Sequence, residues 1–140
     1  MLQYIANRQF TYFSDVESVN GGGVRDLYEN SFKGQLYFLI DGQGNSTTGH
    51  FMAMVKEMEL GVIIGEELGS NHYCTAGQTI FKLKNTRLQF YSANNENWVT
   101  ANSLSPETGI LPDYYISQDI DDYLNKKDVV KDFALDLIGE

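Results

Sequence analysis

A strand–helix–strand pattern in the first half of the chain constrains its fold more than any other feature. Residues 35–40 (QLYFLI) form a nearly continuous apolar run of strand length, and residues 61–65 (GVIIG) form a second, shorter one. Between them, residues 46–60 place apolar side chains at helical spacing: Phe51, Met52, Val55 and Met58. Two buried strands joined by one helix are typical of a βαβ unit in a parallel sheet, so we predict an α/β fold.

The other expected elements are short. We predict helices near both ends of the chain, over residues 2–6, 119–124 and 127–138. We predict a strand over residues 10–13, a loop over residues 14–34, a β-hairpin formed by residues 78–83 and 87–91, and a second loop over residues 92–108. No linker or repeat interrupts the chain, so residues 1–140 are expected to form a single domain.

Composition narrows the classes of partner. Ten Lys and Arg residues stand against nineteen Asp and Glu residues, which gives a net charge of −9. Nucleic acids and anionic membranes are bound mainly through clustered basic side chains, so neither is an expected partner. The single cysteine, Cys74, cannot form an intrachain disulfide or a metal site alone, and we expect no cofactor or metal. No apolar run approaches the roughly 20 residues of a membrane helix, and the N-terminus has no pattern of a signal peptide.

Ser46 lies between the first apolar strand and the helix, directly after the glycine-rich turn 41–45 (DGQGN). In α/β folds, ligands bind at the carboxyl ends of the strands. The free N–H groups and the positive dipole end of a helix can stabilise an oxyanion there. Ser46 is therefore a candidate nucleophile. Serine is also an ordinary N-cap residue, and on the pattern alone a capping role is the stronger interpretation.

Three motifs, taken in order, carry a resemblance to a known family. Residues 36–50 (LYFLIDGQGNSTTGH) are similar to its nucleophile strand and turn, and residues 61–69 (GVIIGEELG) to its "(V/I)(V/I)GE-x-x-G" strand end. Residues 109–113 (GILPD) match its "G-(I/V)-x-P-D" element. Together they cover about residues 35–116 and resemble the C-terminal part of the catalytic domain of the C-terminal processing (tail-specific) serine peptidases.

The resemblance implies a fold and an activity. The family has a ClpP/crotonase-like α/β fold, of which this chain would be a partial domain with the βαβ unit, the β-hairpin and the C-terminal helices. The upstream part of the catalytic domain would be absent. The family hydrolyses peptide bonds, often near C-termini, so the expected partner is a peptide or protein substrate. Its members are usually exported, which implies a periplasmic or cell-surface location.

The resemblance also implies roles for individual residues. Ser46 would be the nucleophile, and the backbone N–H of Thr47 would help to form the oxyanion hole. A second donor would come from a glycine upstream in the family, and Gly44 is a further backbone candidate next to Ser46. Glycine allows the substrate backbone to approach closely.

The general base is the point at which the pattern departs from the family. The processing peptidases use a lysine shortly after the "GE-x-x-G" element, and residues 69–73 (GSNHY) contain none. His72 lies beside the expected position and is a candidate base, with Glu107 as a candidate acid that orients the base. His50 follows Ser46 by four residues, but we expect it at the domain surface.

Several alternatives remain open. The base could be a histidine on an earlier part of the chain, as in the tricorn-like branch, or activity could be lost. Residues 20–23 (NGGG) are similar to a glycine turn of the family, but we interpret them as a loop. The alternative function is a non-catalytic peptide-binding or assembly module. A sheet edge left open by missing upstream strands would favour homo-oligomers through edge pairing.

Overall fold

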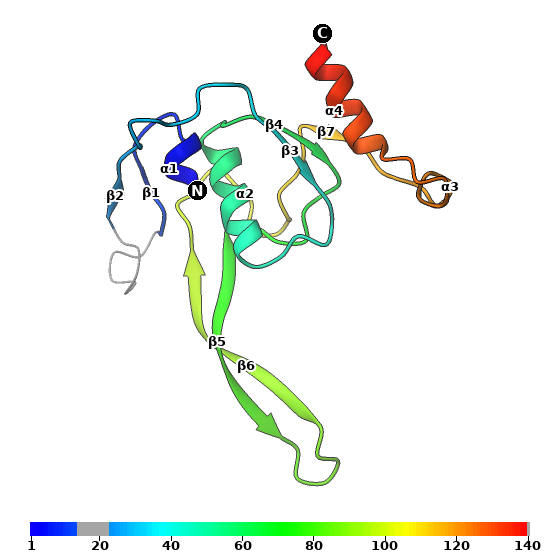
Figure 1. Ribbon diagram of the computed structural model, residues 1–140. Helices are drawn as coiled ribbons and strands as arrows, with labels where there is room; N and C mark the ends of the chain where they lie inside the picture. The colour runs from blue at the N-terminus through cyan, green and yellow to red at the C-terminus, as the bar shows by residue number, and fades with distance from the viewer. Residues whose placement is uncertain (14–22, 140) are drawn as a thin grey trace.

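The predicted βαβ unit is the centre of the computed structural model, which describes residues 1–13 and 23–139. Strand β3 (Tyr37–Ile40) leads through a turn into helix α2 (Thr47–Glu57) and then into strand β4 (Val62–Gly65) (Figure 1). The two strands are parallel, with Phe38 opposite Ile63. The prediction of a parallel βαβ unit is confirmed. Residues 20–22 of the proposed glycine loop lie outside the described residues.

A third strand, β7 (Tyr114–Tyr115), extends the sheet in the order β3-β4-β7, and it also runs parallel to β4. The sequence analysis did not predict it because two residues carry no periodicity. Asp113, directly before β7, connects this strand to β4 and α2. Its carboxylate accepts a hydrogen bond from the backbone N–H of Ile63 at 2.9 Å and forms an ion pair with Lys56 of α2 at 2.5 Å.

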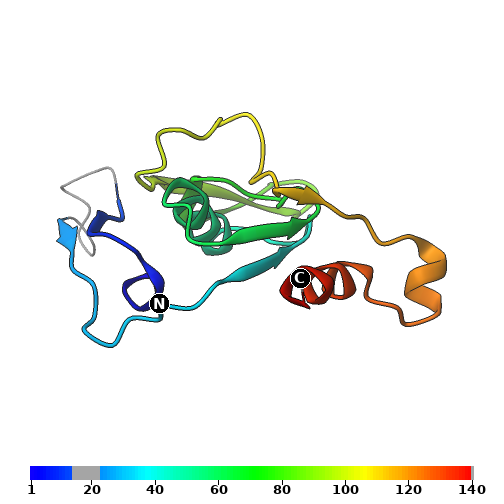
Figure 2. The same cartoon turned by 90° about the horizontal axis from the view of Figure 1, so that it is seen from above.

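The hydrophobic core lies between the sheet and α2. Ile63 is fully buried and belongs to the core cluster with Met52 and Val55 of α2. Because neighbouring residues of a strand face opposite sides, the equally buried Ile64 faces away from α2. Helix α4 (Val129–Gly139) contacts β3 and β4, and its Phe133 ring packs on Tyr114 with ring centroids 5.3 Å apart. Figure 2 shows α2 and α4 on opposite sides of the sheet.

The predicted C-terminal helices are confirmed as α3 (Ile120–Leu124) and α4. The N-terminal part contains the expected helix, α1 (Leu2–Ile5), and the expected strand in shorter form, β1 (Phe10–Thr11). Strand β1 pairs with β2 (Val24–Arg25), so the prediction of a continuous loop over 14–34 is wrong at these residues. Among residues 1–13 and 23–139, none of the helices has the length and apolar character that crossing a membrane requires.

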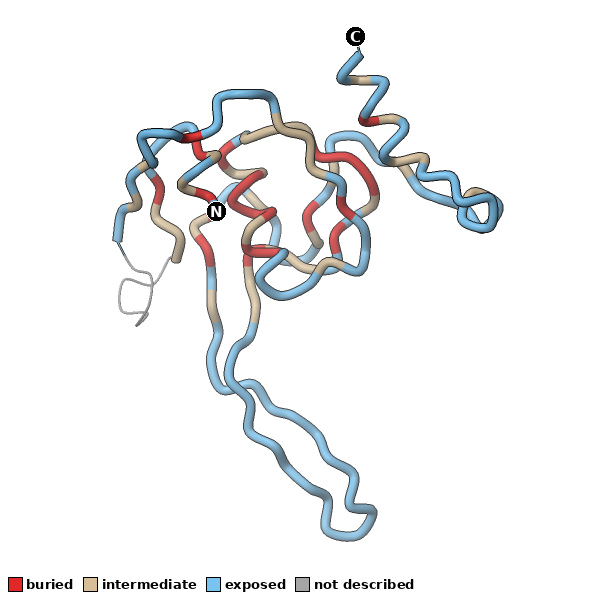
Figure 3. The backbone as a smooth tube through the Cα atoms, in the orientation of Figure 1, coloured by how far each residue is buried: buried red, intermediate tan, exposed pale blue. Residues whose placement is uncertain are grey.

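The β-hairpin is longer than predicted. Strands β5 (Tyr73–Lys82) and β6 (Gln89–Trp98) pair antiparallel from Tyr73 opposite Trp98 to Lys82 opposite Gln89. Residues 92–98, predicted as loop, are therefore strand. The hairpin extends away from the rest of the protein with most of its residues exposed, so these side chains are polar (Figure 3). The sequence pattern therefore did not indicate a strand. We call β5 and β6 with their connecting turn the arm.

Candidate active site

Ser46 is held in a strained backbone conformation between β3 and α2. Its φ is 52° and its ψ is −123°, and its exposed side chain makes no capping hydrogen bond to the helix. A non-glycine residue in a sparsely populated region of this kind costs about 1–3 kcal/mol. The capping role that the pattern favoured is therefore wrong. A strained strand-to-helix turn with an exposed hydroxyl is how α/β hydrolases present a nucleophilic serine.

The turn leaves backbone donors beside Ser46 without an acceptor among the described residues, and the N–H of Thr47 is one of them. The N–H groups of Thr48 and Gly49 donate to the carbonyls of Asn45 and Ser46 at 3.0 and 2.9 Å. Among the described residues, the backbone N–H of Thr47 has no hydrogen-bond acceptor. It lies at the N-terminus of α2, where a free N–H can donate to an oxyanion. The predicted role of Thr47 is compatible with this geometry and stays a prediction.

Gly44 is placed by packing and by the turn. Its N–H donates to the carbonyl of Asp41 at 3.3 Å, and a Cβ at this position would collide with the side chain of Leu68. Only glycine lets the turn lie this close to Leu68. Its predicted role beside the oxyanion is not tested by these contacts.

His50 is buried, with 2% of its surface exposed, so the expectation of a surface position is wrong. The reason is long-range packing: the rings of Tyr12 and Phe13, near β1, lie edge-on to the imidazole at centroid distances of 6.3 and 6.2 Å. The His50 Nδ1 atom lies 3.9 Å from Sγ of Cys74. Its Nε2 atom is buried and has no hydrogen-bond partner among the described residues.

The environment of His50 favours its neutral form. Burial lowers the pKa of His50, an interaction with the backbone of Asn97 opposes this, and the neighbouring His72 lowers the pKa further. At neutral pH a histidine with a lowered pKa is uncharged, and one ring nitrogen can accept a proton. His50 therefore has the protonation state that a general base needs.

His72 lies close to His50 at the start of β5. It is 8% exposed, its ring centroid lies 5.4 Å from that of Trp98, and its Nδ1 has no partner among the described residues. Within residues 1–13 and 23–139, no hydrogen bond between His72 and Ser46 is recorded, and no group of three or more metal-ligating side chains is found. The role of His72 as base stays a prediction.

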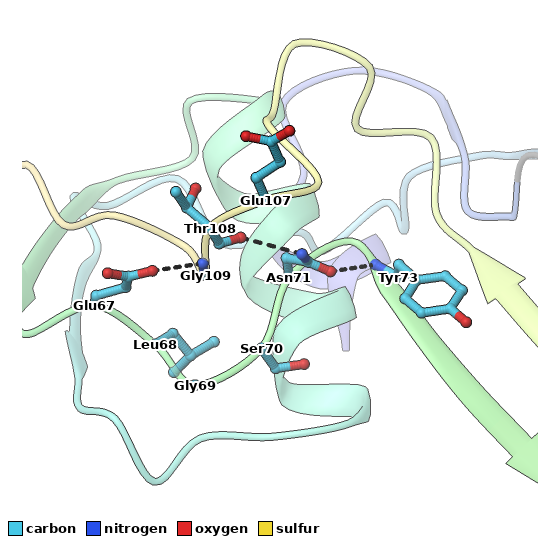
Figure 4. Close-up of a pocket in the computed structure, with 9 residues that line it drawn as sticks. All are labelled: Glu67, Leu68, Gly69, Ser70, Asn71, Tyr73, Glu107, Thr108 and Gly109. Atoms are coloured by element: carbon cyan, nitrogen blue, oxygen red, sulfur yellow. Dashed lines mark hydrogen bonds between the residues drawn. The ribbon is translucent and has the colours of Figure 1, made fainter. Parts of the chain in front are cut away.

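Glu107 lies in a pocket of about 480 Å³ formed by the loop before Gly109 and the segment after β4 (Figure 4). Asn71 ties the two sides together, because its side-chain amide donates to the carbonyl of Thr108 at 3.1 Å. Glu67 accepts the N–H of Gly109 at 2.7 Å, as expected for a carboxylate at a strand end. The described residues show no hydrogen bond from a histidine to the Glu107 carboxylate, so its orienting role stays a prediction.

A larger groove, of about 1000 Å³, adjoins the turn that precedes Ser46. It lies between β3, the start of α2 and the segment that carries α3. Its lining is apolar with an acidic border; the apolar side chains include Phe38, Leu39, Phe51, Met52, Leu68, Ile116 and Ile120, and the carboxylates are Asp41, Glu66, Asp119 and Asp128. No lysine or arginine lines it among the described residues. Gly44 and Thr48, which flank Ser46 in the sequence, line the groove.

The sequence analysis missed the grouping of Ser46 with His50 and Cys74. Burial raises the pKa of the Cys74 thiol, and the neighbouring Ser46 side chain has a smaller, opposite effect. One signal was available: His72 and Cys74 are two residues apart, and alternate residues of a strand share a face. Lys56 forms an ion pair with Asp113, and Lys82 lies in the arm.

No protein-family model and no curated protein sequence matches the chain. Two solved structures are similar to it. The crystal structure of the tricorn protease has 20% sequence identity and a TM-score of 0.51, over 87% of this chain and 12% of that one. The crystal structure of "a putative peptidase" from Parabacteroides merdae has 13% identity and a TM-score of 0.62, over 96% of this chain and 44% of that one. The chain thus has a fold found in peptidases and spans less than half of either neighbour.

Proposed function

We propose that this chain is the nucleophile-bearing part of a serine peptidase with a ClpP/crotonase-like fold, and that Ser46 attacks the scissile carbonyl. The observation that carries the proposal is the backbone of Ser46, with φ 52° and ψ −123° and an exposed hydroxyl that caps nothing. Strain at a residue that does not stabilise the helix is expected where a side chain must be presented for chemistry. The fold shared with two peptidase structures supports the same reaction class.

The reaction would follow the usual course of acyl transfer. Ser46 Oγ bonds to the carbonyl carbon while a base takes its proton, and the N–H of Thr47 donates to the developing oxyanion. The carbon–nitrogen bond then breaks, the amine leaves with the proton, and water hydrolyses the acyl-enzyme. The sequence indicates His72 as the candidate base and Glu107 as the acid that orients it. A base on a part of the protein outside this chain is the alternative.

The groove beside the turn is the proposed site for the peptide substrate. Its apolar lining suits aliphatic or aromatic side chains, and its carboxylates favour substrates with a positive charge. Cleavage near C-termini, as in the tail-specific peptidases, and a periplasmic or cell-surface location belong to the same proposal. They rest on the motif resemblance of residues 36–50, 61–69 and 109–113.

A fluorophosphonate probe tests the proposal, because it labels serines only where a base and an oxyanion hole activate them. We expect mass spectrometry to locate the label at Ser46, in this chain or in a longer chain that carries the upstream sequence. Ser46→Ala should abolish labelling. Ser92→Ala in the exposed arm is the matched control and should leave labelling unchanged.

A second candidate function is a peptide-binding or assembly module that does not hydrolyse its ligand. It is favoured by the absence, within the described residues, of a recorded contact between Ser46 and either His72 or Glu107. This function predicts that both chain lengths fold and bind peptides but remain unlabelled by the fluorophosphonate. That combination of results would rule out hydrolysis through Ser46.

A further inference from the structure

Three side chains, including that of the proposed nucleophile, lie where α2 packs against β5. Ser46 directly precedes α2, His50 lies in the first turn of that helix, and Cys74 lies on β5, which packs against α2. Burial raises the pKa of the Cys74 thiol and the neighbouring Ser46 hydroxyl opposes this, and Cys74 Sγ lies 3.9 Å from His50 Nδ1. Cys74 therefore stands between the hydroxyl and the imidazole.

The position of each group suits proton transfer in one direction. Ser46 is exposed and can reach a substrate, Cys74 is partly buried, and His50 is 2% exposed. Burial raises the pKa of the Cys74 thiol, which keeps its proton at neutral pH. A protonated thiol can donate to an imidazole nitrogen and accept from a hydroxyl at the same time.

The surroundings of His50 contain few competing charges. The groups that face its ring are Cys74 from β5, Tyr12 and Phe13 near β1, the backbone of Asn97 in β6, and His72. In the described residues, none of these is a carboxylate, a lysine or an arginine. The pKa of His50 is therefore set mainly by its burial, with smaller effects from the Asn97 backbone and from His72.

We propose that Cys74 and His50 form a proton path from Ser46, with His50 as the proton acceptor and Cys74 as the residue that links it to the hydroxyl. This rests on the proposed function. As Ser46 Oγ bonds to the carbonyl carbon, its proton passes to Sγ while the thiol proton passes to His50 Nδ1. A neutral thiol and an imidazolium result. The proton returns along the same path and leaves with the amine when the carbon–nitrogen bond breaks, so no further reactant is required.

This path differs in a testable way from a base at His72. General-base catalysis contributes about 10²–10⁴-fold, so His50→Gln should slow labelling of Ser46 at least about a hundredfold. His72→Gln tests the competing base and should slow labelling less than about tenfold if His50 is the acceptor, since it then removes only a neighbour of the acceptor. Cys74→Ala should slow labelling strongly, whereas Cys74→Ser keeps a hydroxyl in the path and should restore most of the rate.

The pH profile gives a readout that a purely structural role would not move. In the unaltered protein, labelling should rise with pH and level off below the ordinary histidine pKa, because burial lowers the pKa of His50. His50→Gln should remove this step. A full loss of labelling in His72→Gln, with His50→Gln unaffected and both variants folded, would overturn the proposal.

Nuclear magnetic resonance separates this proposal from the proposed function. In the folded protein with ¹⁵N-labelled histidine, Cys74→Ala and Ser46→Ala should each shift the Nδ1 resonance of His50, and Cys74→Ala should shift its titration midpoint. Unchanged His50 resonances in both variants would overturn the proton path even if Ser46 is labelled. If the His50 resonances shift in both variants but Ser46 is not labelled, the proton path is retained and the hydrolytic function is rejected.

Discussion

The βαβ unit and the arm both carry isoleucine in their strands but gain stability in different ways. Ile63 in β4 is fully buried between the sheet and α2, whereas Ile80 in β5 is 58% exposed on a two-stranded ribbon. The sheet strands are held by neighbours on both faces, and the outer part of the arm is held by one ladder of hydrogen bonds and by cross-strand pairs. An isolated two-stranded hairpin is only marginally stable in water. An isoleucine in the βαβ unit is therefore stabilised by burial in a way that an isoleucine in the arm is not.

The largest expected difference comes from one substitution made in both regions. Ile63→Ala leaves a cavity in a packed core, so we expect it to reduce the free energy of unfolding by about 2–5 kcal/mol. Ile80→Ala changes an exposed position and should alter it by at most about 0.5 kcal/mol. Urea unfolding followed by circular dichroism measures both. Equal losses for the two variants would mean that the arm is as well packed as the core.

Glycines with positive φ provide a second matched pair. Gly65 in β4 has φ 128°, and a Cβ there would collide with the carbonyl oxygen of Ile40. Gly77 in β5 has φ 65°, and its Cβ would meet the side-chain amide of Asn95 at 3.2 Å and the side chain of Asn94 at 3.6 Å. Gly77→Ala should cost about 1–2 kcal/mol from the backbone conformation alone. Gly65→Ala adds a backbone collision and should cost more in the same measurement.

The same contrast explains which parts of the fold the sequence predicted. The βαβ unit was predictable because residues 35–40 and 61–65 are apolar throughout and the helix between them is periodic. Strand β6 was not, because its pairing uses backbone hydrogen bonds beneath polar side chains such as Ser92 and Asn95, which resemble a loop. Strand β7 has too few residues to show a pattern.

The candidate site was predictable only where it is local in sequence. Ser46 follows a strand and a glycine turn, so its position could be inferred, but its strained backbone could not. The burial of His50 depends on Tyr12 and Phe13, which are distant in the chain. The contact between His50 and Cys74 depends on how β5 packs against α2, which no local pattern encodes.

We expect the strained backbone of Ser46 to lower the stability of the well-packed region. Glycine tolerates a positive φ, so Ser46→Gly should raise the free energy of unfolding by about 0.5–1 kcal/mol. This is the strain that is relieved, reduced by the larger loss of conformational entropy when glycine folds. Arg87, with φ 63° in the turn of the arm, is the control. Arg87→Gly should change the global value by at most about 0.5 kcal/mol. If Ser46 capped the helix, Ser46→Gly would destabilise the protein by a few tenths of a kcal/mol instead.

The arm is also where we expect copies of the chain to associate. Its two strands have unpaired edges among the described residues, and edges with exposed apolar side chains favour pairing with another chain. Charged side chains block such pairing, so Ile80→Lys should reduce the mass measured by sedimentation at high protein concentration. Ile138→Lys is the matched control, because Ile138 on α4 is 57% exposed. Both substitutions should alter the free energy of unfolding by at most about 0.5 kcal/mol. A monomer at every concentration in the unaltered protein would contradict edge pairing, and an equal effect of the two variants would assign association to surface charge rather than to the arm.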